Sequence, residues 1–158
     1  MQAEPQQEHQ WLEQLVGEWQ TEMECVMEPD QPSMKQTGSE TVRSLSVWVL
    51  CEGTSTMPDG RPARTMMTLG YDPAKKKFVG TFVGSMMTNL WVYEGELDAA
   101  GGVLTLDAEG PSFTDHTKTA KYKDAIEIKS ADHRVMTSRF QADDGQWHLF
   151  MTAHYRRK

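Results

Sequence analysis

Histidine offers the widest range of chemistry in this sequence, and the spacing of the histidines limits what they can do. His148 and His154 lie six residues apart in one expected strand, on the same face and about 20 Å from each other. Such a pair cannot enclose a compact metal site. The sequence also contains no H-E-x-x-H motif and no paired-cysteine motif. We therefore expect no bound metal and no cofactor.

Motifs for nucleophilic or phosphate chemistry are also missing from the sequence. It contains no G-x-S-x-G motif, no catalytic-cysteine signature and no glycine-rich phosphate loop. A cofactor-independent enzyme would instead need a titratable group among apolar walls. The candidates for such a group are Arg43, Tyr71, Asp72, His148 and His154.

The chain is rich in side chains that could line an apolar cavity, with eleven Met and five Trp. Methionine fills irregular space and adapts to varied partners, and neighbouring Met residues in a strand point to opposite faces. We expect a hydrophobic ligand that is neutral or anionic, because His or Arg would supply the inward charge. The expected lining is Trp48, Met67, Tyr71, Phe82, Met86, Trp91 and Tyr93, with His148 as the polar anchor. A fully packed core is the alternative.

A repeated strand–turn pattern must position these residues. Apolar residues at helical spacing predict a short helix over residues 8–16, with Gly17 as its C-terminal cap. Alternation begins at Trp19, and residues 28–38 read as a long connection. The pattern predicts an all-β fold, an antiparallel up-and-down barrel of about nine or ten strands with a short N-terminal helix. A β-sandwich is the alternative.

Length and charge limit the class of protein. The 158 residues suggest a flexible leader over residues 1–6 and a single barrel domain over residues 7–158. A net charge of -7 argues against nucleic acid and against anionic membranes as partners. We expect a cytoplasmic protein, because residues 1–10 lack the features of a signal peptide and no apolar run spans a membrane. The redox state of Cys25 and Cys51 is left open.

The junction "GEW" at residues 17–19 resembles the calycin superfamily, which includes lipocalins and fatty-acid-binding proteins. That resemblance implies that Trp19 closes one end of a barrel beneath the helix, with Arg156 or Arg157 packed across it. The segments "LVGEW", "GYDPAKKKFVGTFV", "YEGELDAAGGVLTL" and "YRRK" together resemble the bacterial DUF1579 family. This second resemblance implies the same fold and carries no biochemical activity.

The sequence thus favours a small-molecule-binding barrel for a hydrophobic ligand. The alternative is a cofactor-independent enzyme, an isomerase, cyclase or hydrolase, that uses the same interior. Two further interpretations stay open: a haem held by His148 or His154, as in some calycins, and a barrel without a ligand that binds a macromolecule. A homodimer is likewise left open.

Overall fold

The part of the chain that the structure describes, residues 3–26 and 31–158, folds into one short helix and ten strands in a computed structural model. Helix α1 spans Gln7–Glu13. The strands are β1 (Gly17–Cys25), β2 (Met34–Leu45), β3 (Trp48–Thr56), β4 (Pro62–Asp72), β5 (Lys77–Gly84), β6 (Trp91–Leu97), β7 (Val103–Pro111), β8 (Thr119–Ser130), β9 (His133–Gln141) and β10 (Trp147–Arg157). Within the described chain no helix combines the length and apolar character needed to cross a membrane.

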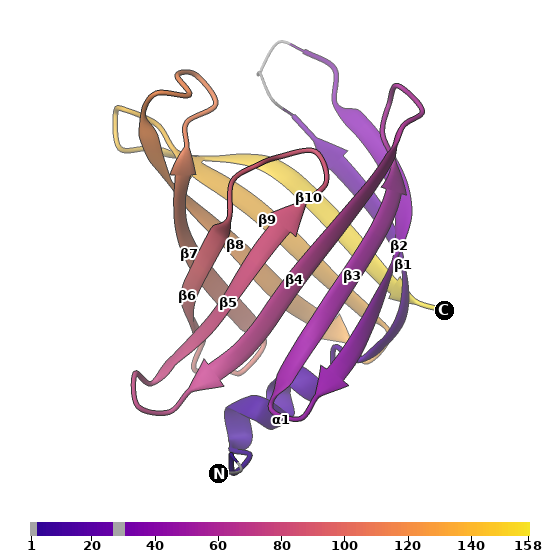
Figure 1. Cartoon of the computed structure of the whole chain (residues 1–158), viewed down its shortest axis with the longest axis vertical. Coiled ribbons are helices and arrows are strands. Elements are labelled where there is room, and N and C mark those ends of the chain that lie inside the picture. Colours follow the sequence, from indigo (N-terminus) through magenta and orange to yellow (C-terminus); the bar gives the residue numbers. More distant parts are fainter. Residues whose placement is uncertain (1–2, 27–30) are drawn as a thin grey trace.

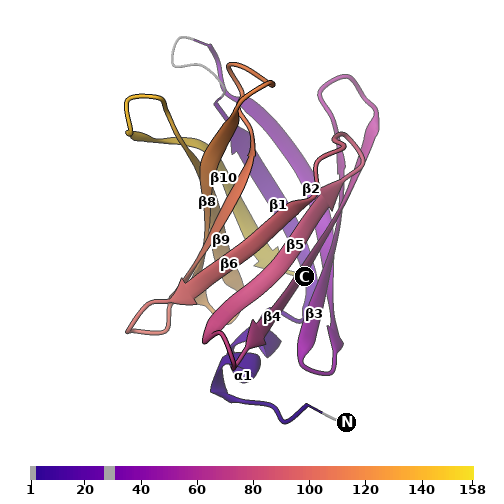
Figure 2. The ribbon, with the colours of Figure 1, turned by 60° about the vertical axis from the view of Figure 1, so that its left-hand side comes forward.

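The strands form a closed antiparallel barrel in which each strand pairs with its neighbours in the sequence (Figures 1 and 2). β1 pairs with β10 and thereby closes the sheet, with Trp19 opposite Arg157. Closure leaves no free sheet edge that could pair with another chain. The predicted all-β up-and-down barrel with a short N-terminal helix is confirmed.

Local boundaries differ from the prediction at three places. The helix ends at Glu13 rather than Val16, and Gly17 begins β1 instead of capping the helix. The expected connection 28–38 is shorter, because β2 already begins at Met34; residues 27–30 lie outside the described residues. Residues 1–2 of the predicted leader also lie outside them.

One end of the barrel, here called the closed end, is packed with apolar side chains and covered by α1 (Figures 1 and 2). A seven-residue helix is too short to be stable alone, so tertiary contacts must hold it. The Trp11 indole N–H donates a 2.7 Å hydrogen bond to the carbonyl of Gly101. The largest fully buried side chains here are Leu12, Leu15, Trp19, Val42, Val49, Leu69, Phe78, Leu104 and Leu106.

The opposite end, here called the open end, carries the hairpin loops 57–61 and 142–146 and the loops 85–90 and 112–118 (Figure 1). Inward-facing residues near this end keep part of their surface accessible, in contrast to those near α1. They include Met23, Thr65, Phe82, Trp91, Phe140 and Met151. Packing is therefore complete at the closed end and less complete at the open end.

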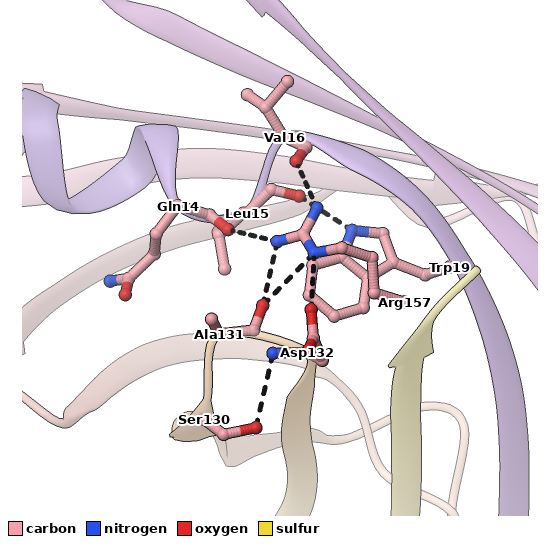
Figure 3. Close-up of polar contacts among 8 residues, drawn as sticks. All are labelled: Gln14, Leu15, Val16, Trp19, Ser130, Ala131, Asp132 and Arg157. Atoms are coloured by element: carbon pink, nitrogen blue, oxygen red, sulfur yellow. Dashed lines mark hydrogen bonds and ion pairs between the residues drawn. The ribbon is translucent and has the colours of Figure 1, made fainter.

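Trp19 is the centre of the closed end, with only 2% of its surface exposed. Its indole N–H donates to the carbonyl of Leu15 at 2.9 Å. The Arg157 guanidinium lies 4.2 Å from the ring centroid and donates to the carbonyls of Gln14, Val16 and Ala131 (Figure 3). The predicted contact between Trp19 and Arg157 is confirmed, whereas Arg156 faces outward beside Glu22.

Gly17 is required by this arrangement. Its φ of +140° lies in a region that L-residues rarely adopt, and a Cβ here would lie 2.3 Å from Arg157 Nη1. The Gly–x–Trp junction therefore lets the chain pass under the arginine that covers Trp19.

We predict that Gly17→Ala lowers the free energy of unfolding by about 2–4 kcal/mol, through backbone strain and displacement of Arg157. Gly102→Ala is the matched control, because a Cβ there would meet no described atom within 4 Å. Urea unfolding measures both. In an Arg157→Ala background Gly17→Ala should lower the free energy of unfolding by less, because the clash with the Arg157 side chain is absent. Equal costs in the two backgrounds would contradict this explanation.

Candidate functional site

A buried ion pair crosses the interior next to the closed end. Arg134 on β9 donates through Nη2 to Glu40 on β2, and their side chains are only 6% and 11% exposed. The guanidinium carbon lies 4.5 Å from the Trp19 ring centroid and 4.0 Å from that of Tyr155. Burial raises the pKa of Glu40, and the Arg134 charge opposes that rise. Arg134 Nη1 is buried without a hydrogen-bond partner among the described residues.

Asp124 on β8 is a second acid that faces the interior. The Tyr93 hydroxyl donates a 2.5 Å hydrogen bond to its Oδ2, and Ser138 lies opposite in the β8–β9 register. Burial raises the pKa of Asp124, while the hydrogen bonds from Ser138 and Tyr93 favour the carboxylate and oppose the rise. Burial and the Asp124 charge likewise raise the pKa of Tyr93.

The charge of Asp124 has no cationic partner within the described chain: no Lys, Arg or His forms an ion pair with it. The residue faces inward and its carboxyl is largely buried, although part of the residue remains in contact with solvent. A buried carboxylate without a counter-charge is unfavourable, so a cationic group that reached it would stabilise it.

Five aromatic side chains, here called the aromatic collar, line the open end beside β6–β10: Trp91, Phe113, Tyr122, Phe140 and Phe150. Their rings meet edge to face, with centroids 4.8 Å apart for Trp91–Tyr122 and 5.0 Å apart for Phe113–Phe150. Phe113, from the loop after β7, also contacts Tyr122 and Phe140. Such edge-to-face packing fixes the rings relative to one another, and Phe113 is the most exposed of the five.

Four of the predicted lining residues face the interior together. Met67, Phe82 and Trp91 are direct register partners on β4, β5 and β6, and Tyr93 lies two residues deeper than Trp91. Trp91 also packs across Gly110, where a Cβ would lie 2.3 Å from its ring. These residues form one continuous wall that joins the aromatic collar.

Three other predicted lining residues lie elsewhere. Trp48 points outward and covers Gly70. The turn after Leu45 shifts the inward–outward alternation of β3 by one residue, so Val49 is buried instead. Tyr71 lies at the closed end, with its ring centroid 5.0 Å from that of Phe78. Met86 is not in a strand; it lies in the loop after β5, with Sδ over Gly84 at the rim.

The two histidines of β10 do not share a face, contrary to the prediction. A β-bulge between Leu149 and Met151 reverses the alternation of side chains. His148 is exposed at the rim and stacks on Phe140 at a centroid distance of 5.4 Å. His154 faces outward, where its Nδ1 lies 2.9 Å from Nε2 of His133. His148 is therefore a rim residue and not an interior anchor.

Sequence reasoning missed the interior charges and most of the aromatic collar. One signal was readable: Asp124 interrupts the inward series Tyr122, Ile126 and Ile128 at period two. Phe150 could not be placed, because the bulge lies beside it. The Glu40–Arg134 contact joins positions 94 residues apart, and nothing local indicates it.

Two hollows lie on the outer face of the barrel. One of about 540 Å³ is lined by exposed side chains such as Gln20, Thr37 and Thr54, and a second of about 290 Å³ lies beside Glu22 and Lys35. Sites for apolar molecules are enclosed and have few polar groups, whereas both hollows are open and lined largely by polar or charged residues, so neither suits the expected ligand. Within residues 3–26 and 31–158, no three His, Cys, Asp or Glu side chains form a group that could hold a metal ion. Cys25 and Cys51 are free thiols.

Comparison with known proteins agrees with this geometry. The fold defines a ten-stranded antiparallel barrel closed at one end, the architecture that the calycin resemblance implied. Residues 4–157 match the family described as "Protein of unknown function (DUF1579)", and the chain belongs to that family. No curated protein matches the sequence significantly.

Several solved structures share the fold at low sequence identity. Rv2717c from M. tuberculosis superposes with a TM-score of 0.66 at 14% identity, covering 98% of this chain and 99% of that one. The S-type phycobiliprotein lyase CPES from Guillardia theta gives a TM-score of 0.60 at 12% identity, with 98% of both chains covered. The structure titled EF1p2_mFAP2b bound to DFHBI gives 0.51 at 16% identity, covering 95% and 98%.

We predict that breaking the buried ion pair costs more than removing it. Glu40→Gln leaves the Arg134 charge buried alone and should lower the free energy of unfolding by about 3–5 kcal/mol. Adding Arg134→Met should restore part of that stability. Glu94→Gln, which breaks an exposed pair with Lys75, should cost at most about 1 kcal/mol. Urea unfolding at pH 7 measures all three; a double variant less stable than Glu40→Gln would contradict the prediction.

We also predict that Asp124→Asn stabilises the protein at pH 8. The pKa of Asp124 is raised in the folded state, so the native carboxyl keeps its proton to higher pH than the unfolded one. The fold therefore loses stability as pH rises through the native pKa, and a neutral amide avoids that loss. In urea unfolding, Asp124→Asn should have a higher free energy of unfolding than the wild type at pH 8 and nearly the same one at pH 4. Destabilisation at pH 8 would show that the charge is stabilising.

Proposed function

We propose that the protein binds a small hydrophobic molecule in the open half of its barrel. The observation that carries this proposal is the aromatic collar, which places large apolar surfaces at an accessible end of the interior. The walls are Met67, Phe82, Trp91 and Tyr93 together with the collar, and His148 and Met86 lie at the rim. Apolar walls with a few polar groups are typical of small-molecule sites.

The division of the barrel into two halves supports a binding role. The closed half contains most of the packed core and the cover of α1. The open half keeps inward apolar side chains partly exposed, which costs free energy unless a ligand covers them. Barrels of similar fold include one solved with bound DFHBI, which supports a small-molecule-binding role for this architecture.

Fluorescence of N-phenyl-1-naphthylamine, a neutral apolar probe, tests the proposal. The probe should bind saturably, with enhanced emission. Phe113→Ala, which removes an exposed collar ring, should weaken binding about fivefold, the equivalent of roughly 1 kcal/mol. Leu45→Ala, an exposed apolar side chain at the closed end, is the matched control and should leave binding unchanged. No saturable signal, or equal effects of the two substitutions, would contradict the proposal.

A cofactor-independent enzyme is a second candidate, and Asp124 is the observation that favours it. This carboxyl lies among apolar walls with a raised pKa and a tyrosine hydrogen bond, which suits proton transfer to or from a bound molecule. Deuterium exchange at the α-carbon of 2-acetylnaphthalene, followed by NMR, tests it. Exchange catalysed by the wild type and lost in Asp124→Asn would favour the enzyme; binding without exchange would favour the carrier.

A further inference from the structure

The interior charges of the barrel are unequal, and this inequality specifies the ligand more closely than apolar walls do. Arg134 and Glu40 neutralise each other within one ion pair. Asp124 is bound only by neutral donors, the hydroxyls of Tyr93 and Ser138. The ligand expected from the sequence is neutral or anionic; the interior charges argue against the anionic choice, because Arg134 is already paired and His148 lies at the rim.

The position of Asp124 relative to the aromatic collar supplies the geometry. Tyr122 precedes Asp124 by two residues on β8, so both face inward and Tyr122 lies one pleat, about 7 Å, nearer the open end. Phe140 and Ser138 repeat this arrangement on β9 as their register partners. A molecule that enters past the collar rings therefore meets the carboxylate next.

An aromatic surface next to a carboxylate favours a cationic ligand over an anionic one. Aromatic faces attract cations through the ring quadrupole, and a carboxylate accepts hydrogen bonds from an ammonium group. A ligand carboxylate would instead place a second negative charge beside Asp124. The apolar body of an amine can meanwhile cover the exposed parts of Phe113 and Trp91.

We propose that the open half selects an apolar amine, with the protonated nitrogen at Asp124 and the hydrocarbon part within the aromatic collar. This specificity rests on the proposed binding function and names its ligand class. Tyr93 and Ser138 hold the carboxylate in place and leave lone pairs for the N–H donors of the ligand. Asp124 is thus the residue that sets specificity.

Isothermal titration with three ligands of one shape tests the proposal: 2-naphthylmethylamine, 2-naphthylmethanol and 2-naphthoic acid. The amine should bind at least about tenfold more tightly than the alcohol, since a hydrogen bond to a charged group contributes this much. The acid should bind most weakly. Asp124→Asn should erase the advantage of the amine and leave the affinity for the alcohol unchanged.

Asp107→Asn is the matched control, because Asp107 lies on the outer face of neighbouring β7 beside Lys123. This variant should keep the preference for the amine. If amine and alcohol bind equally to the wild type, or if Asp107→Asn acts like Asp124→Asn, the amine specificity is wrong while binding of apolar molecules stands. If none of the three ligands binds and N-phenyl-1-naphthylamine gives no signal, both proposals are wrong.

Discussion

The stack of Arg157, Trp19 and Arg134 is the interaction on which the rest of the barrel depends. The guanidinium carbons of Arg157 and Arg134 lie 4.2 and 4.5 Å from the centroid of the indole ring, and that of Arg134 lies 4.0 Å from the Tyr155 ring centroid. The stack joins the first strand to the last two, so it fastens the seam where the sheet closes. Each cation–π contact contributes about 0.5–2 kcal/mol, and burial favours the upper value.

This stack also requires a polar partner in the interior. A buried arginine needs a counter-charge, and Glu40 on β2 supplies it across the seam of β1 and β10. The interior then changes from apolar packing near α1, through the ion pair and Asp124, to the aromatic collar at the open end. The packed core and the proposed binding site thus lie at different ends of one barrel. A carboxylate without a counter-charge weakens the fold, which is a frequent cost of a functional residue.

The sequence predicted those features that depend on local alternation. Met67, Phe82, Trp91 and Tyr93 face inward as expected, because their strands run without interruption from turn to turn. The prediction of which side chains face inward was wrong at Trp48 and at His154. A turn before β3 shifts the alternation of its side chains by one residue, and a bulge in β10 does the same there. A shift of one residue is enough to move a side chain from the interior to the surface.

The polar contacts of the interior could not be predicted, because each of them joins residues on strands that are distant in the sequence. Glu40 meets Arg134 only once the barrel has closed, and Tyr93 reaches Asp124 across the intervening β7. The signal within each strand was a polar residue at an inward position, which indicates a buried partner without naming it. The closing contact of Trp19 with Arg157 was predictable because it follows from the calycin resemblance, while the second arginine was not.

The most direct test of a ligand site in the open half is NMR of the protein labelled with ¹³C at the methionine methyl groups. Met67, Met136 and Met151 face the interior from three different strands, whereas Met66 faces outward on β4 and serves as an internal reference. Addition of 2-naphthylmethanol should shift the methyl signals of Met67 and Met151 and leave Met66 in place. Shifts confined to Met66, or no shift at ligand saturation, would contradict a binding site inside the barrel.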